Sequence, residues 1–340
     1  MSTTVSVRDV AEHAGVSVGT VSNAMNHPEK VSAAVLERVH EAIEQLGYVR
    51  NDAARQLRVG RSASIGLVVL DVRNPFFTDI ARGAEDAAAD AGLSVILGNS
   101  DEDVAREAAY LDLFEQQRAA GVLISPYGDI TARLHRLRER GIPAVLVDRY
   151  SADATFSSVS VDDEAGGRLA VEHLIAQGRR RIAFVGGPLD IRQVSDRLEG
   201  ARQAVAVHPD VTLEVIETEA LSVIEGRAAG QRIVARTGAD GTARPDAVFA
   251  ANDLIALGVL QALMMQGVGI SVPDEIALIG YDDIDFASAA VVPLSSIRQP
   301  AQLIGRTAVE IMLEESADPE VKPRQVVFQP ELVVRASTGG

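Results

Sequence analysis

The apolar residues at the start of the chain recur at the spacing of short helices. Ser6 and Asp9 form a capping box, which predicts a first helix that starts near Val7. Gly15 ends this helix, and Ser17 caps a second helix after a tight turn. The apolar face of the first helix would consist of Val7, Val10, Ala11 and Ala14.

The second expected helix runs to about Met25 and presents mostly small and polar positions to solvent. These positions are Val18, Gly19, Thr20, Ser22, Asn23 and Asn26. A third amphipathic helix starts at Ser32 and stops at Gly47, which completes a three-helix unit. Two short helices joined by a tight turn are typical of a helix-turn-helix, a motif that places its second helix in the major groove of DNA. An ordinary helical hairpin in a core is the alternative interpretation.

After Gly60 the pattern changes to short apolar runs that alternate with amphipathic segments. The apolar runs predict strands at Ile65–Leu70, Leu93–Leu97, Gly121–Ile124, Ala144–Val147, Ile182–Val185, Leu213–Ile216, Ala247–Ala250 and Ile276–Ile279. The amphipathic segments predict helices at Phe77–Ala91, Ala105–Arg118, Glu164–Gln177 and Leu254–Gln266. Continuous apolar strands that are each followed by a helix are typical of parallel sheets covered on both faces. So many units favour two α/β lobes over a single doubly wound sheet.

Polar residues directly follow several of these predicted strands. The segments concerned are Asn74–Phe77, Ser125–Tyr127, Asp148–Arg149, Asn252–Asp253 and Tyr281–Asp283. Open α/β sheets bind ligands beyond the carboxyl ends of their strands, so these loops predict a ligand site. Each residue alone is more simply explained as a helix cap or a turn former. Five loops at one edge favour the ligand site.

Composition sets limits on the class of protein. The chain has 340 residues, of which 47% are apolar and 24% charged, enough for two or three domains with cores. It has no cysteine, which excludes disulfides and thiolate metal sites. No apolar stretch that could act as a signal peptide precedes Val7, and no run approaches the length of a membrane span. We therefore expect a cytoplasmic protein that uses neither a metal nor a cofactor.

The net charge of −16 is unevenly distributed along the chain. Through Ser62 there are seven basic and seven acidic residues, and four of the basic ones lie between Arg50 and Arg61. The remaining residues carry the whole negative charge. An acidic body repels DNA, which would leave DNA binding to the N-terminal part of the chain.

The N-terminal motif becomes more specific when the residues around it are included. The pattern Asp-Val-Ala-x-x-Ala-Gly-Val-Ser-x-x-Thr-Val-Ser covers Asp9 to Ser22. It is followed by Asn26, Val31-Ser32, Gly47-Tyr48, Asn51 and the run Ala53–Leu57. Together these residues resemble the lactose repressor family of bacterial transcription regulators, and the resemblance continues over essentially the whole chain.

The resemblance implies an α/β fold in which a helix-turn-helix head and a hinge helix precede a two-lobed core like that of the periplasmic binding proteins. It places the head at residues 1–49, the hinge at 50–62 and the two-lobed effector-binding and dimerisation domain at 63–340. The chain would cross between the lobes near residues 160, 293 and 323. The expected DNA-binding residues are Ser17, Val18, Gly19, Thr20, Asn23, Asn26, Ser32, Tyr48, Asn51, Ala54 and Leu57, of which Leu57 would wedge into the minor groove beside Ala54.

The resemblance also implies a small effector, most simply a sugar, bound between the lobes. The polar contacts would be Asp148, Arg197, Asn252 and Asp282, with Phe76 and Phe77 as an apolar wall and Ser125 and Tyr127 in a further loop. Carboxylates, amides and guanidinium groups can bridge neighbouring hydroxyls, and an aromatic face accepts the C–H side of a sugar ring.

Two other effector classes remain open. A purine is one of them, although Ile191 and Gln193 stand where the purine repressor has Arg and Thr. An acidic or phosphorylated sugar is the other, because Arg149 and Arg192 could lie near the cleft. The residues do not say whether the effector releases the operator or acts as a corepressor, nor whether a phosphocarrier protein takes part.

A solute-binding protein or a carbohydrate-active enzyme on the same lobes is an alternative of a different class. Asp282 and Asp283 could suggest a glycosidase pair, but adjacent residues generally point apart, and a DNA-binding head has no role in an enzyme. No catalytic residue is therefore assigned. The chain ends at Gly340 without a leucine heptad, which favours a homodimer that binds a palindromic operator.

Overall fold

The computed structural model describes residues 5–48, 62–151, 155–236, 243–265, 267, 269–318 and 320–339. The chain forms two compact units, which divide between Ser62 and Ala63. Each unit is described by itself below.

The N-terminal unit packs three α-helices around a small apolar core. They are α1 (Val7–Ala14), α2 (Val18–Asn26) and α3 (Ala33–Leu46), with a 3-10 turn η1 (Pro28–Lys30) after α2. The capping box forms, since the Ser6 N–H donates to Asp9 Oδ2 over 2.7 Å. Gly15 ends α1 at φ 64°, a left-handed conformation that glycine adopts without strain. Both expected helix-turn-helix helices are therefore present, in the order and at the positions that the apolar spacing predicts.

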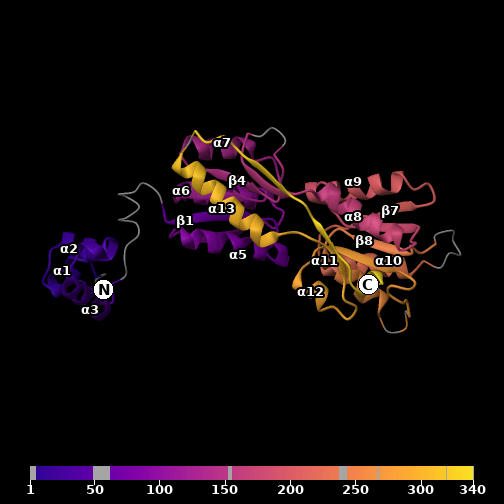
Figure 1. Ribbon diagram of the computed structural model, residues 1–340, viewed down its shortest axis with the longest axis horizontal. Helices are drawn as coiled ribbons and strands as arrows, with labels where there is room; N and C mark the ends of the chain where they lie inside the picture. Colours follow the sequence, from indigo (N-terminus) through magenta and orange to yellow (C-terminus); the bar gives the residue numbers. More distant parts are fainter. Residues whose placement is uncertain are drawn as a thin grey trace. The chain divides into compact units, whose positions relative to one another are not determined.

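The C-terminal unit consists of two α/β lobes (Figure 1). The first, here the N-lobe, has a six-stranded parallel sheet in the order β11-β5-β4-β3-β1-β2. Its strands are β1 (Ser64–Val69), β2 (Ser94–Asn99), β3 (Gly121–Ile124), β4 (Ala144–Val147), β5 (Ser158–Val161) and β11 (Gln325–Phe328). Its helices are α5 (Pro75–Asp90), α6 (Val104–Gln116), α7 (Thr131–Glu139) and α13 (Ala301–Ala317).

The second lobe, here the C-lobe, repeats this plan with the strand order β12-β10-β9-β8-β6-β7. All of its strand pairs are parallel except β10 with β12. The strands are β6 (Arg181–Val185), β7 (Thr212–Ile216), β8 (Ala247–Ala250), β9 (Ala277–Asp282), β10 (Ser295–Arg298) and β12 (Glu331–Val333). The helices are α8 (Asp163–Ala176), α9 (Arg192–Ala206), α10 (Val223–Val234), α11 (Asp253–Leu263) and α12 (Asp285–Ser288), with a final turn η2 (Ala336–Thr338).

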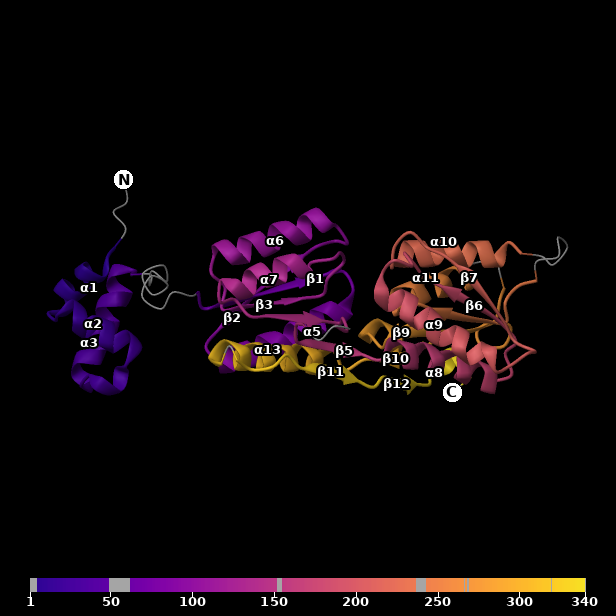
Figure 2. The same cartoon turned by 90° about the horizontal axis from the view of Figure 1, so that it is seen from above.

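The chain passes between the two sheets three times (Figure 2). The passages follow β5 at residue 162, β10 at 299–300 and β11 at 329–330, whereas the sequence suggested 160, 293 and 323. The later two lie further along the chain than expected, because the unpredicted strands β10 and β11 continue beyond residues 293 and 323. The result is that α13 and β11, late in the sequence, belong to the N-lobe.

Three pairs of helices approach so closely that only glycine fits between them. A Cβ atom on Gly83 of α5 would lie 1.9 Å from the Gln302 carbonyl oxygen of α13. A Cβ on Gly167 of α8 would lie 2.0 Å from the Arg197 carbonyl oxygen of α9. A Cβ on Gly258 of α11 would lie 2.1 Å from the Val223 carbonyl oxygen of α10. These contacts fix the positions of helix backbones, including that of α9 at Arg197.

Candidate functional site

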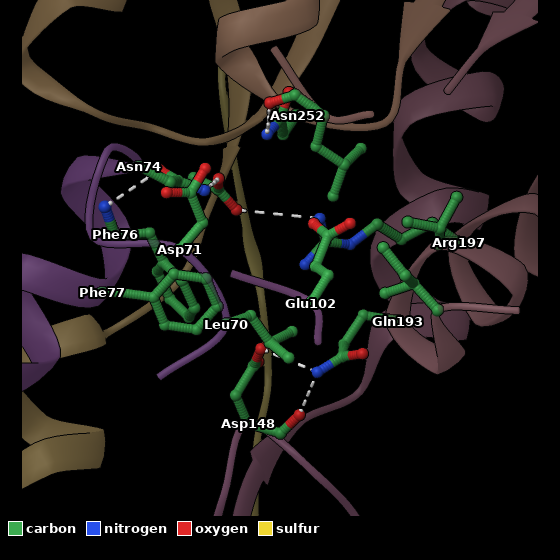
Figure 3. A pocket seen from close by; sticks show the side chains of 14 residues that line it. Leu70, Asp71, Asn74, Phe76, Phe77, Glu102, Asp148, Gln193, Arg197 and Asn252 are labelled. Atoms are coloured by element: carbon green, nitrogen blue, oxygen red, sulfur yellow. Dashed lines mark hydrogen bonds and ion pairs between the residues drawn. The ribbon is translucent and has the colours of Figure 1, made fainter. Parts of the chain in front are cut away.

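A cavity in the C-terminal unit is lined by residues from both lobes (Figure 3). From the N-lobe come Leu70, Asp71, Asn74, Phe76, Phe77, Glu102 and Asp148, and from the C-lobe Ile191, Gln193, Val194, Arg197, Leu221, Asn252 and Asp282. Most of the loops that carry them follow the carboxyl ends of strands, where parallel sheets place their ligands. The enclosed space is narrow, about 30 Å³.

Two pairs of side chains join the lobes across this cavity. Asn74 Nδ2 donates a 2.9 Å hydrogen bond to Asp282 Oδ2, and Gln193 Nε2 donates one of 2.9 Å to Asp148 Oδ2. Gln193 Nε2 also lies 2.5 Å from the Asp148 carbonyl oxygen. Gln299 Nε2 donates to the other Asp282 oxygen over 2.8 Å, so amide groups engage both oxygens of this carboxylate. Several polar groups that could serve a ligand are thus satisfied by one another, whereas Asp148 Oδ1 and Gln299 Oε1 are buried without a partner among the described residues.

Arg197 lies at the centre of a buried network in the C-lobe. Its Nε donates to Asp163 Oδ1 over 2.8 Å, and its NH1 donates to the Ala251 carbonyl oxygen over 2.8 Å. The guanidinium carbon lies 3.7 Å from the centre of the Tyr281 ring, and NH1 lies 3.7 Å from Asp282 Oδ1. Burial alone would lower the pKa of Arg197, but the surrounding anionic groups raise it by more than burial lowers it. Arg197 therefore stays charged.

Burial sets the electrostatics of the cavity's carboxyl groups. It raises the pKa of Asp148 well above the usual range, and it raises that of Asp282 despite the opposing effect of Arg197. Asp148 has φ 54° and Asp282 has φ 100°, in the left-handed region that side chains other than glycine rarely adopt. Strained backbone of this kind tends to cluster at ligand sites.

Six of the eight expected effector residues line the cavity. They are Phe76, Phe77, Asp148, Arg197, Asn252 and Asp282. The two phenylalanines are both buried in the N-lobe core as well, and their rings are in contact with centroids 5.2 Å apart. Asn252 also caps α11, because its Oδ1 accepts from the Ile255 N–H over 2.9 Å. Asn252 therefore both caps a helix and lines the cavity.

The expected residues Ser125 and Tyr127 do not line the cavity. Ser125 is fully buried, and the half-buried Tyr127 has its hydroxyl 3.3 Å from Asp190 Oδ2. This placement corrects the sequence-based expectation. In the loop after β3, the Tyr127 N–H donates a 2.7 Å hydrogen bond to the buried carboxylate of Glu107, which ties this loop to α6.

Sequence reasoning missed Asn74, Glu102 and Gln193 in the cavity, and Gln299 beside it. Asn74 could have been found, since it stands in the expected loop after the first strand. Gln193 was noted only for its difference from the purine repressor. Gln299 follows a strand that its serines disguised, so no pattern indicated it.

The candidate DNA-contacting surface is the exposed face of α2. Val18 is 42% exposed, and Gly19, Asn23 and Asn26 are also exposed. Thr20 is half-buried, and its N–H and hydroxyl lie 3.0 and 2.9 Å from Ser17 Oγ. Asn26 Nδ2 donates to the Ser22 carbonyl oxygen over 2.7 Å, which orients that side chain along the helix.

The remaining expected DNA contacts are less uniform. Ser32 stands exposed at the start of α3, whereas Tyr48 is half-buried against the core of the unit. Asn51, Ala54 and Leu57 lie outside the described residues.

Comparisons with known proteins agree with both units. Residues 6–51 match the profile of bacterial regulatory proteins of the lacI family, and residues 171–338 match the periplasmic binding protein-like domain. The chain is 32% identical over 338 residues to the ribose operon repressor of Halalkalibacterium halodurans, which covers 98% of this chain and 97% of that protein. The chain belongs to the lacI family.

Other lacI-family proteins are similar over a comparable length. The HTH-type transcriptional repressor PurR of Aliivibrio fischeri is 32% identical over 339 residues, which covers 97% of each chain. The crystal structure of the Lac repressor dimer bound to operator and the anti-inducer ONPF has a TM-score of 0.84 at 29% identity, covering 99% of both chains. This lacI-family chain is a DNA-binding transcriptional regulator and not an enzyme, with the helix-turn-helix and two-lobed α/β fold that the sequence predicts.

Two kinds of feature are absent from the residues that the structure describes. No helix among them is long and apolar enough to cross a membrane. Within the same part of the chain, no group of three or more His, Cys, Asp or Glu side chains could hold a metal ion.

Proposed function

We propose that this regulator is a cytoplasmic repressor whose operator affinity is controlled by a sugar bound between the two lobes. The observation that carries the proposal is the convergence of Asp148, Arg197, Asn252 and Asp282 on one cavity whose opposite wall is Phe76 and Phe77. Polar groups that pair with hydroxyls on one side and aromatic faces on the other suit a pyranose or furanose ring.

A sugar would act by exchanging contacts with groups that already join the lobes. Asn74 with Asp282, and Gln193 with Asp148, hold the lobes together in the described arrangement. A hydroxylated ligand offers each of these groups a new partner and must therefore change the distance or angle between the lobes. Such a ligand shifts a regulator between two arrangements only through unequal affinity for them.

Ribose is the first sugar to test, because the ribose operon repressor is similar over nearly the whole chain. The similarity to PurR supports a purine as the second candidate. We favour the sugar, because Ile191 and Gln193 stand where the purine repressor has Arg and Thr, and the Gln193 amide is tied to Asp148.

We further propose that the regulator acts as a homodimer on a palindromic operator, as the similarity to the Lac repressor dimer suggests. Strand β2 lies at the edge of the N-lobe sheet and exposes Ile96 and Leu97, at 38% and 41%. Exposed apolar side chains on an edge strand are a liability in a monomer and are covered in an assembly. This edge would pair with the same edge of a second copy.

The test has two stages. In a thermal-shift screen of the full chain against ribose, other sugars, hypoxanthine and guanine, a sugar should raise the melting temperature most. At ~100 times its dissociation constant, a bound ligand should raise the free energy of unfolding by about 2.7 kcal/mol. A gel shift with the DNA upstream of the gene that encodes this chain should then show that adding the sugar changes the affinity for the operator. If only a purine raises the melting temperature, the effector is a purine and not a sugar. If neither class raises it, the proposed effector site is wrong.

A further inference from the structure

Glu102 differs from the other carboxylates of the cavity in its surroundings. It lies in the loop between β2 and α6, is half-buried and lines the cavity. In Figure 3 its side chain is drawn among residues of both lobes, between those that follow β1 and those of α9. Within the described part of the chain, no hydrogen bond or ion pair engages its carboxylate, whereas Asp71, Asp148 and Asp282 each have a donor within 3.0 Å.

The backbone holds Glu102 in place at a cost. Asp101 and Glu102 have φ values of 54° and 57°, so two successive residues other than glycine adopt the left-handed conformation. Each such residue costs free energy and persists only where its surroundings enforce it. The Asp101 side chain accounts for part of this, since it pairs with Arg73 and Arg106 over 3.0 and 3.1 Å. Nothing comparable anchors Glu102, whose side chain extends to the cavity instead.

The charges around the cavity are unbalanced. Its lining contains four carboxyl groups, those of Asp71, Glu102, Asp148 and Asp282, and one guanidinium, that of Arg197. Arg197 is already paired with Asp163 outside the lining, so it offers no uncompensated positive charge to a ligand. Burial and the nearby Asp71 raise the pKa of Glu102, and the nearby Arg73, which pairs with Asp71 and Asp101, offsets this rise only in part.

The two arginines that could favour an anion do not reach this cavity. Neither Arg149 nor Arg192 belongs to its lining. Arg192 is exposed and is held by both carboxylate oxygens of Asp196, at 2.8 and 2.9 Å. Arg149 is half-buried outside the cavity lining, and burial together with the nearby Arg192 lowers its pKa despite the opposing carboxylates of Asp196, Asp148 and Glu107.

We propose that Glu102 is a specificity-determining residue that restricts the effector to uncharged sugars by repelling phosphorylated ones. The inference rests on the proposed sugar site and names its ligand class more narrowly. A phosphate group within the cavity would lie near an unpaired carboxylate in a partly desolvated space, where like charges repel far more strongly than in water. A neutral sugar would instead donate its hydroxyl protons to the same carboxylate.

The experiment compares each sugar with its own phosphate ester on the full-length protein. Isothermal titration calorimetry would use ribose, xylose, glucose and galactose, each beside its monophosphate, for wild type, Glu102→Gln and the control Glu85→Gln. Glu102→Gln removes the charge and keeps the shape. Glu85→Gln removes the same charge at an exposed position of α5 in the same lobe, which does not line the cavity.

In wild type we expect at least one neutral sugar to bind, with its phosphate ester at least about tenfold weaker. Glu102→Gln should narrow this ratio by about tenfold, Glu85→Gln should leave it within about twofold, and added salt should narrow it in wild type. A phosphate ester that binds as tightly as its sugar, or a ratio that Glu102→Gln leaves unchanged, would overturn the role of Glu102 while the sugar site stands. If neither sugars nor esters bind, the sugar site itself is wrong and the role of Glu102 falls with it.

Discussion

The side-chain amide of Asn74 in the N-lobe donates a hydrogen bond of 2.9 Å to the carboxylate of Asp282 in the C-lobe, 208 residues later in the chain. Asn74 also caps α5, because its Oδ1 accepts from the Phe76 N–H over 3.1 Å. The same residue therefore fixes the start of a helix and joins the two lobes. A carboxylate oxygen can accept a second hydrogen bond, so Asp282 can bind a sugar hydroxyl while its contact with Asn74 lengthens or breaks.

Asp282→Asn is expected to weaken sugar binding by roughly ten- to a hundredfold, because a charge-assisted hydrogen bond contributes about 1.5–3 kcal/mol. Operator affinity without sugar should stay near that of wild type, since the DNA-contacting unit is untouched. Calorimetry with ribose and a gel shift measure the two effects. Asp285→Asn, at an exposed position three residues later, is the matched control and should change neither. Equal sugar affinity in Asp282→Asn and wild type would remove Asp282 from the site.

Gly167→Ala tests whether helix packing positions Arg197. The new Cβ would lie 2.0 Å from the Arg197 carbonyl oxygen, so α9 must move away from α8. We expect a loss of about 1–3 kcal/mol in unfolding free energy, as for other overpacked sites, together with weaker sugar binding. Gly230→Ala introduces a similar clash, 2.6 Å from the Ala262 Cβ, away from the cavity. It should lower the melting temperature without changing sugar affinity, and a loss of affinity in both variants would mean that general destabilisation is the cause.

Asn23→Ala tests the recognition surface of α2. An exposed asparagine can pair with adenine through two hydrogen bonds, so its removal should cost ~1–3 kcal/mol and relax the preference at one base pair per half-site. Asn26→Ala serves as comparison, because that amide is engaged by the Ser22 carbonyl oxygen and should affect affinity more than base preference. Selection from a randomised operator library measures the preference. If Asn23→Ala selects the same sequences as wild type, another residue reads that base.

Glu107→Gln concerns the pH dependence of stability. Burial raises the pKa of Glu107, even though the Tyr127 N–H donates to it. A group with a raised pKa in the folded state stabilises the fold below its unfolded pKa and loses this contribution as the pH rises through the folded value. Wild type should therefore become less stable on going from mildly acidic to neutral pH. Burial raises the pKa of Asp148, Asp253 and Asp282 in the same direction.

The variant retains an acceptor for the Tyr127 N–H but cannot ionise, so its melting temperature should fall less over the same pH range. The exposed Glu139→Gln on α7 is the control and should follow the wild-type curve. Parallel curves for Glu107→Gln and wild type would show that this carboxyl does not contribute to the pH dependence.

The apolar strands and the helix-turn-helix could be predicted from the sequence because their patterns are local. All eight predicted strands are present, whereas β11, β12 and two serine-rich strands, β5 (Ser-Val-Ser-Val) and β10 (Ser-Ser-Ile-Arg), were missed. Three of their four buried serines are satisfied by distant partners, as in the 2.7 Å bond from Ser296 Oγ to Asp253 Oδ1, whereas the Ser160 hydroxyl has none among the described residues. A polar strand of this kind looks like a loop until its partners are known.

Some residues of the candidate site could also be located from local patterns, and others could not. Residues directly after apolar strands, such as Asp148 and Asn252, could be located from the strand pattern with the help of the family resemblance. Gln193 lies in α9, which no pattern predicted, and Gln299 follows the missed β10. Their roles depend on contacts with residues that are distant in the sequence, and one sequence does not encode those contacts locally.

The glycine contacts between helices have a consequence for anyone who would turn this regulator into a biosensor. Side chains that line the cavity, such as Leu221 and Glu102, can be exchanged to admit a new ligand, because no backbone contact depends on them. Gly83, Gly167 and Gly258 cannot be exchanged, because a carbonyl oxygen of a neighbouring helix occupies the space that a side chain would need. A combinatorial library should therefore randomise the former positions and hold the latter constant, so that its members vary in what they sense while the scaffold that transmits the signal stays the same.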